Sequence, residues 1–169
     1  MKAAGLVLAI VLALALQTTL ARFVIRGTVA VDLVLVVVVY VALISGPVTG
    51  LLSGAAAGLA QDALSSGVIG IGGLAKTVVG FAVGFIGSQF IVTRPFPRFV
   101  VFLAATAAHA ALFIGLYVLL SQRDFGSPVA AVTGQALGNA VVGVLAFQLV
   151  EFLPGAVERR RAQKARIHR

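Results

Sequence analysis

Charge is scarce in this sequence, and cysteine and tryptophan are missing from it. Of its 169 residues only 11% are charged, and the mean hydropathy of +1.11 is far above that of a water-soluble domain. Without cysteine the chain has no disulfide, no thiol nucleophile and no thiolate metal ligand. The two histidines, His109 and His168, lie too far apart in sequence to form a metal motif. The composition therefore indicates an integral membrane protein, and we expect no metal or cofactor.

Apolar runs long enough for a transmembrane helix recur along the whole chain. The segment LVLVVVVYVALI (33–44) is apolar on every face, which favours helices over the alternating pattern of a β-barrel. Prolines mark the boundaries: Pro47 opens a helix, RPFPR (94–98) separates two helices, and Pro154 closes the last one. We predict an all-α polytopic bundle of about six transmembrane helices. The predicted spans are 3–21, 29–45, 46–64, 70–93, 99–121 and 128–153.

The end of the first predicted span allows two interpretations. Gln17, Thr18 and Thr19 are expected at the membrane interface. A lysine, an apolar run and the small residues of TLA (19–21) also resemble a secretory signal peptide with its cleavage site. The run is longer than a usual signal core, so we predict a retained span.

Arginine and lysine are distributed unevenly between the two sides of the predicted bundle. With six spans both termini lie on one side, which then carries nine cations against three on the other. By the positive-inside rule, both termini are predicted in the cytoplasm. Residues 1–157 form one transmembrane domain and residues 158–169 a basic cytoplasmic tail. The nine cations are Lys2, Arg94, Arg98, Arg159, Arg160, Arg161, Lys164, Arg166 and Arg169, and the three are Arg22, Arg26 and Arg123.

The basic tail, ERRRAQKARIHR, contains six of the thirteen cations and no aromatic residue. Nucleic-acid binding is therefore not predicted, because no stacking platform accompanies the charge. Anionic lipid attracts such a segment by about 1 kcal/mol per cation near the surface. We expect lipid contact here, with a cytoplasmic protein partner as the alternative.

Glycines recur every four residues in the third predicted span and again in the fourth, leaving one face of each helix almost without side chains. Helices in a bilayer associate by close backbone packing at such faces. We interpret this as an internal packing seam, the alternative being contact with another subunit, and expect the third span to be central. The glycines are Gly46, Gly50, Gly54, Gly58, Gly80 and Gly84.

Two charges flank the glycine-rich turn between the third and fourth spans. Antiparallel packing brings Asp62 and Lys76 to similar depth, with Gln61 beside them. Either charge alone costs roughly 2.5–3.5 kcal/mol at the centre of a transmembrane helix. We predict a polar pair that fixes helix register, the alternative being a functional polar site in a cavity or at a partner surface.

Other polar residues within the spans are assigned structural roles. Asp32 opens the second span, where helix N–H groups favour a carboxylate. Thr106 and His109 share a face of the fifth span, and Gln135 and Asn139 share a face of the sixth, which indicates interhelical hydrogen bonds. No phosphate loop, carboxylate pair or nucleophile triad is recognisable, so catalysis is not predicted.

The order of these features resembles the MreD family of bacterial rod shape-determining membrane proteins. The resemblance runs from LQTTL (16–20) through VDLVLVVVVYVALISGPVTGLLSGAAAGLAQDALSSGVIGIGGLAKTVVGF (31–81). Its most specific part is the glycine-rich helix leading to Gln61-Asp62, followed by Leu74-Ala75-Lys76. The last three spans carry only a general likeness. Val31 departs from the proline that the family often has before the aspartate of the second span, so helix entry there is less rigid.

The resemblance implies a binding protein of the bacterial cytoplasmic membrane and no reaction. MreD-like proteins are regarded as partners of the single-span protein MreC, within a cell-wall elongation machinery that includes MreB, RodA and a class B penicillin-binding protein. Their fold is described as similar to the S-components of energy-coupling-factor transporters. The leading hypothesis is thus a scaffold for peptidoglycan synthesis. The competing one is a substrate-binding transporter subunit, and a holin-like channel is weaker because no helix carries a polar stripe.

Overall fold

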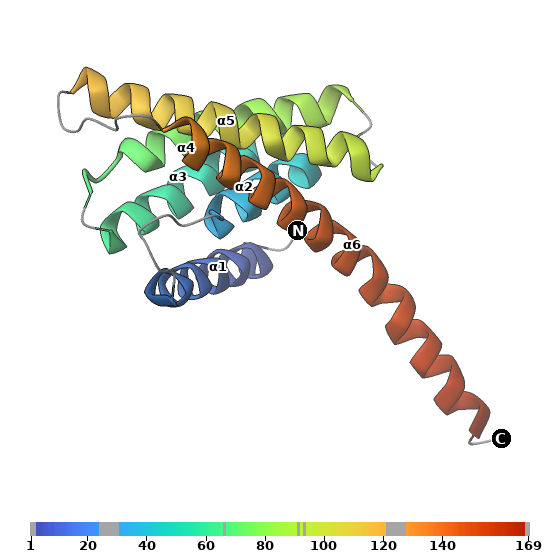
Figure 1. Ribbon diagram of the computed structural model, residues 1–169. Helices are drawn as coiled ribbons and strands as arrows, with labels where there is room; N and C mark the ends of the chain where they lie inside the picture. Colours follow the sequence, from blue (N-terminus) through green and yellow to red (C-terminus); the bar gives the residue numbers. More distant parts are fainter. Residues whose placement is uncertain are drawn as a thin grey trace.

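The computed structural model describes the backbone of residues 3–23, 31–65, 67–90, 92, 94–120 and 128–167, and the side chains of 4–19, 31–65, 67–90, 92, 94–120 and 128–152. This part of the chain is all-helical. Helices α2, α3 and α4 lie between α1 on one side and α5 with α6 on the other, and the C-terminal end of α6 runs beyond the bundle (Figure 1). The helices are α1 (Ala3–Phe23), α2 (Leu33–Ser45), α3 (Pro47–Leu64), α4 (Ile71–Gln89), α5 (Pro95–Leu119) and α6 (Val129–Ile167).

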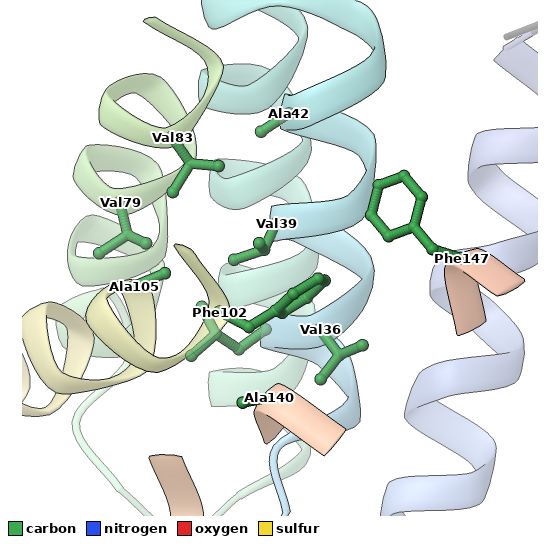
Figure 2. Packing of buried hydrophobic residues seen from close by; sticks show 10 residues of the cluster. Val36, Val39, Ala42, Val79, Val83, Phe102, Ala105, Ala140 and Phe147 are labelled. Atoms are coloured by element: carbon green, nitrogen blue, oxygen red, sulfur yellow. The ribbon is translucent and has the colours of Figure 1, made fainter. Parts of the chain in front are cut away.

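Helix α2 occupies the centre of the bundle, which corrects the expectation that the third span is central. A helix that is apolar all round belongs in a protein core or in a membrane, and α2 packs against each of the other five helices. Val36 and Val39 of α2 pack with Val83 of α4 and Phe102 of α5 in the main core (Figure 2). The opposite side of α2 packs against Ala13 and Ala57 through two further valines. Helix α2 therefore connects α1 and α3 on one side with α4, α5 and α6 on the other.

The glycine face of α3 packs directly against α4. A Cβ added to Gly54 would overlap the backbone carbonyl of Lys76, and one added to Gly58 would lie 2.6 Å from Gly73 Cα. Because backbone meets backbone on both sides, no side chain can move aside to admit a larger residue. The helices thus form an internal seam along their length. Its paired positions are Gly50 with Gly80, Gly54 with Lys76, Gly58 with Gly73, and Gly84 with Gly46 and Pro47.

Two helix boundaries differ from the prediction because of proline. Helix α5 begins at Pro95 and not at 99, since the N–H groups of a first turn have no intrahelical acceptor and two prolines there cost little. Helix α6 does not stop at Pro154 but continues to Ile167, across the predicted 157/158 boundary. A proline after a long helix is thus a poor stop signal here.

Three helical segments in the described residues are long and apolar enough to cross a membrane: Ile71–Gln89, Pro95–Leu119 and Val129–Phe152. Ala4–Thr19 and Leu33–Ser45 are apolar but shorter. The 13 residues of α2 span about 20 Å, against a hydrocarbon core of about 30 Å. The structure is a bundle of the membrane type, and the count of six spans stays a prediction.

The α3/α4 seam generates a test at Gly54. We expect Gly54→Ala to lower the free energy of unfolding by about 1–3 kcal/mol, because the added methyl group must push two backbones apart. Gly115→Ala is the matched control, since Gly115 also lies in a helix but a Cβ added there would have no atom within 4 Å. Thermal unfolding of both purified variants in detergent, followed by size-exclusion chromatography, measures the difference. Equal midpoints for the two variants would contradict the seam.

Candidate functional site: a buried polar network

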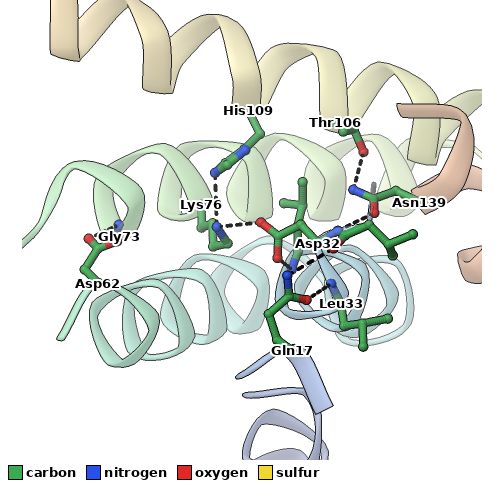
Figure 3. Close-up of polar contacts among 11 residues, drawn as sticks. Gln17, Asp32, Leu33, Asp62, Gly73, Lys76, Thr106, His109 and Asn139 are labelled. Atoms are coloured by element: carbon green, nitrogen blue, oxygen red, sulfur yellow. Dashed lines mark hydrogen bonds and ion pairs between the residues drawn. The ribbon is translucent and has the colours of Figure 1, made fainter. Parts of the chain in front are cut away.

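Polar side chains from five helices meet near the N-terminus of α2 (Figure 3). We call this cluster the polar network. It lies on the side of α2 where α4 also begins, and every member but Gln17 is almost fully buried. Its members are Gln17 of α1, Asp32 at the start of α2, Lys76 of α4, Thr106 and His109 of α5, and Asn139 of α6.

The ion pair of Asp32 and Lys76 is the centre of the polar network. Lys76 Nζ lies 3.0 Å from Asp32 Oδ2 and 3.1 Å from His109 Nε2. Lys76 is 3% exposed and Asp32 5%. A lysine ammonium only donates hydrogen bonds, so His109 Nε2 accepts and the ring proton resides on Nδ1. His109 Nδ1 is buried without a hydrogen-bond partner among the described residues.

The second oxygen of Asp32 caps α2, as the sequence predicted. Asp32 Oδ1 accepts the backbone N–H of Leu35 at 3.0 Å. A carboxylate at this position satisfies an otherwise unpaired N–H and is favoured by the helix dipole. One side chain therefore starts the central helix with one oxygen and binds α4 with the other.

Asn139 and Gln17 connect the outer helices to the same point. Asn139 Oδ1 accepts the backbone N–H of Asp32 at 2.8 Å, and its Nδ2 donates to Thr106 Oγ1 at 3.0 Å. Gln17 donates to the carbonyl of Val31 and accepts from the N–H of Leu33. The predicted interhelical role of Thr106, His109 and Asn139 is what the structure shows. Gln17, expected at the interface, instead bonds to the backbone at the start of α2.

Asp62 and Lys76 do not pair with each other. Asp62 Oδ2 accepts the backbone N–H of Gly70 at 2.8 Å and that of Gly73 at 2.9 Å. Figure 3 shows the contact with Gly73. Gly70 is the N-cap of α4 and Gly73 lies in its first turn, where N–H groups lack intrahelical acceptors and can bind a carboxylate. Asp62 thereby closes the turn between α3 and α4, and Lys76 binds Asp32.

The turn between α3 and α4 is also held from α5. The Tyr117 hydroxyl accepts the N–H of Val68 at 2.9 Å. Gly70 has φ +105°, a left-handed conformation that favours glycine. Gln61, the third predicted polar residue, has a buried Oε1 without a hydrogen-bond partner in the described part of the chain. The structure thus places Gln61 and Asp62 at the turn and Lys76 in the polar network.

A second buried cation lies toward the other end of α5 and α6. Arg98 is 5% exposed, pairs with Glu151 and lies 4.2 Å from the centre of the Phe147 ring. Its Nε also donates to the carbonyl of Val92. We call Arg98, Phe147 and Glu151 the arginine clamp. It joins the first turn of α5 to α6 close to the last apolar turn.

These contacts satisfy charges by pairing and capping inside the protein. The described residues contain no group of three or more histidine, cysteine, aspartate or glutamate side chains placed to hold a metal ion. The buried charges of Asp32 and Lys76 balance each other, and their neighbours are backbone groups and neutral side chains. The observed contacts of this arrangement join helices to one another.

Comparison with known proteins gives one family. A family model described as rod shape-determining protein MreD matches residues 2–153. The match covers every residue of the polar network and of the arginine clamp. No curated protein and no solved structure matches the chain.

The polar network predicts which pair of substitutions compensates. Lys76→Gln should lower the free energy of unfolding by about 3–5 kcal/mol, because it leaves the Asp32 carboxylate buried without its cation. Adding Asp32→Asn should recover much of this loss, since the uncompensated charge is then gone. Unfolding in detergent of the two single variants and the double variant gives the coupling energy.

Asp62→Asn in the Lys76→Gln background is the control for this cycle. It also removes a negative charge near α4, yet Asp62 makes its bonds to backbone N–H groups and not to Lys76. Its effect should add to that of Lys76→Gln. Two results would contradict the observed pairing. One is that Asp62→Asn recovers the stability lost in Lys76→Gln, and the other is that Asp32→Asn does not recover it.

Proposed function

The chain belongs to the MreD family of rod shape-determining proteins, and we propose that it acts without catalysis as a membrane scaffold of the cell-wall elongation machinery. The family match assigns a role in determining rod shape. The finer proposal is that the bundle binds the single transmembrane span of an MreC-like protein in the bacterial cytoplasmic membrane. Through that partner it helps hold RodA, a class B penicillin-binding protein and MreB in one assembly.

The observation that supports a scaffold best is that the charged and amide groups of the polar network are already bonded within the protein, although His109 Nδ1 has no partner among the described residues. Lys76 forms an ion pair with Asp32 and a hydrogen bond with His109. Asn139 forms hydrogen bonds with the backbone N–H of Asp32 and with the Thr106 hydroxyl. A transporter subunit needs polar groups that converge on a ligand. Here a ligand would have to displace a buried ion pair whose two charges already offset each other. The network is therefore better suited to hold helices in place than to bind a small molecule.

The outer surface of the bundle supports recognition by a transmembrane partner. Large apolar side chains on α1, α3 and α4 are more than half exposed, including Leu12, Val48 and Leu74. In a bilayer such surfaces meet lipid or another helix, and the choice depends on shape and packing. The glycines of α3 pack against α4 inside the bundle and do not face a partner. In this proposal the partner therefore contacts these outer apolar side chains.

The proposed topology has six spans with both termini in the cytoplasm. Helices α2, α3 and α4 alternate in direction, so α2 and α4 start from the same side, as the contact of Asp32 with Lys76 requires. The short α2 crosses at the centre of the bundle, where α1, α3, α4, α5 and α6 all pack against it. The likeness to S-components stays a prediction.

A complementation experiment tests the scaffold directly. Cells depleted of the chain should lose rod shape, and the wild-type gene should restore it and recover the MreC-like protein on affinity purification. Lys76→Gln should fail in both readouts, because the bundle is destabilised. Lys76→Gln with Asp32→Asn should restore both, because a scaffold needs the fold and not the charges.

The double variant also separates the scaffold from a functional charge site. A double variant that accumulates at wild-type level, retains the MreC-like partner and still gives round cells would show that the charges themselves act. That result would contradict the proposal. Arg94→Gln, which removes an exposed cation outside the polar network, is the control and should complement fully.

A further inference from the structure

An amide side chain lies on α6 inside the apolar segment of this helix. α6 is at the edge of the bundle (Figure 1), and its apolar segment is Val129–Phe152. Gln148 lies one turn before the end of that segment, is half-buried, and makes no side-chain hydrogen bond with a described residue. By contrast, the large exposed side chains of α3 and α4, such as Leu52 and Phe81, are apolar. Gln148 therefore distinguishes the outer surface of α6.

An amide without a partner is costly at this depth. The hydrocarbon core of a bilayer contains no water to bond with it, and polar side chains there bond to neighbouring helices instead. Leu149 and Phe152, which follow Gln148, are 64% and 73% exposed, so the apolar outer surface continues beyond the amide. The position of Gln148 thus favours a bond to a helix outside this bundle.

The residues that share a face of α6 with Gln148 form a continuous stripe. They follow one another at intervals of three and four residues, the spacing of a helix–helix seam, and fall within a sector of about 80° at 100° per residue. Its leucines and valine are 47–57% exposed, and a Cβ added to its glycine would have no atom within 4 Å. We call these residues the α6 stripe: Gly134, Leu137, Val141, Leu145, Gln148 and Phe152.

A second copy of this chain is the occupant that matches the α6 stripe. A glutamine side chain has both a donor and an acceptor, so two Gln148 amides can exchange two hydrogen bonds. Copies inserted in the same direction are related by a twofold axis along the membrane normal, and their α6 helices then run parallel. Each residue of the stripe meets its counterpart at the same depth. A second copy therefore supplies the polar partner by symmetry.

The rest of the α6 stripe is compatible with such a contact. Its large apolar residues can interdigitate, and Gly134 allows the two helices to approach closely at the other end. Glu151, the charge nearest in sequence, lies about 60° round the helix from Gln148. It is also paired with Arg98 of its own chain. No unpaired charge is therefore brought to the twofold axis.

We propose that the chain forms a parallel dimer through the α6 stripe, in which the two Gln148 amides bond to each other. The outer side chains of α1, α3 and α4 stay available to an MreC-like partner in this dimer. The inference needs α6 to cross the membrane, and it depends neither on that partner nor on a role in cell shape. Lipid and a helix of another protein are the rival occupants of the stripe.

Depth within the bundle can be matched for a control, because α2 and α6 run parallel with a constant offset. Asn139 bonds to the backbone N–H of Asp32. Phe147 packs against Tyr40 with ring centres 4.4 Å apart. Each pair is 107 residues apart in sequence. Leu145 of the α6 stripe is therefore level with residue 38 of α2.

Cysteine cross-linking tests the contact, since the chain has no cysteine of its own. Leu145→Cys should give a covalent dimer on mild oxidation in native membranes. Phe81→Cys is the matched control, because Phe81 is also exposed and follows Gly80, where an added Cβ would lie 3.2 Å from Val38 Cγ1. It should give little dimer. Equal yields from the two variants, or no dimer from Leu145→Cys, would overturn the proposal.

The role of the amide is tested by Gln148→Leu. The dimer dissociation constant, measured by single-molecule photobleaching of the full chain in lipid bilayers, should rise about fivefold or more, as expected for the loss of two interhelical hydrogen bonds. Neither the fold nor the thermal midpoint should change, because Gln148 makes no side-chain hydrogen bond with a described residue. An unchanged dissociation constant would contradict the proposed contact.

Gln135→Leu is the control for this measurement. Gln135 lies on the same helix, is also half-buried and also makes no side-chain hydrogen bond with a described residue. It lies about 140° round the helix from Gln148, outside the α6 stripe. Its substitution should leave the dissociation constant as it is. An equal loss in both variants would show a general effect of polarity and overturn the proposal.

The rival occupants are separated by the purified wild-type chain. In bilayers without any other protein it should already dimerise as its ratio to lipid rises. A chain that stays monomeric at every ratio would assign the α6 stripe to lipid or to another protein and overturn the proposal. Neither cell shape nor an MreC-like partner enters these readouts. Failure here therefore leaves the scaffold proposal standing, and failed complementation would leave the dimer standing.

Discussion

A buried lysine in an apolar bundle must find a negative charge, and the pairing of Lys76 with Asp32 is the constraint on which the rest of the fold depends. Each charge alone is costly at membrane depth. Asp32 can reach Lys76 only if α2 and α4 start from the same side and lie side by side. The same carboxylate caps α2, so the position of the central helix and the neutralisation of Lys76 are set together.

Two kinds of packing surround this pair, and each suits a bilayer. Lipid provides little hydrophobic drive for helix association, so close contact and polar bonds must supply it. On one side of α4 the glycines of α3 allow backbones to touch. On the other, large side chains such as Phe102 fill the space around α2. Thr106, His109 and Asn139 then add hydrogen bonds that select one arrangement of α5 and α6.

The local features of the fold are readable from the sequence, and the long-range partners are not. The four-residue spacing of Gly50, Gly54 and Gly58 locates the face that meets α4. Asp32 is identifiable as a cap because its signal lies within one turn of helix. The predicted partner of Lys76 is wrong, because span order places Asp32 and Asp62 at the same end and gives no preference between them. The N–H groups of Gly70 and Gly73 bind Asp62, and Asp32 is the aspartate that pairs with Lys76.

The helix ends show the same limit of local reading. From the prolines, one helix is expected to begin after residue 98 and the last helix to end at Pro154. Instead α5 begins with prolines in its first turn, and α6 continues past Pro154. The arginine clamp is also missed, because from the sequence Arg98 counts only as a topological charge. Its partners, Phe147 and Glu151, are about 50 residues away, and no short-range pattern connects them.

The central claim is that Lys76 pairs with Asp32 in the core of the bundle, and a distance measurement tests it without changing the sequence. Solid-state NMR on the protein in lipid bilayers, with ¹⁵N-labelled lysine and ¹³C-labelled aspartate, reports which carboxyl group lies beside the lysine nitrogen. A strong dipolar coupling between Lys76 Nζ and the Asp32 carboxyl carbon is expected from the 3.0 Å separation of nitrogen and oxygen. A coupling of Lys76 to Asp62 instead, or to no aspartate, would contradict the account.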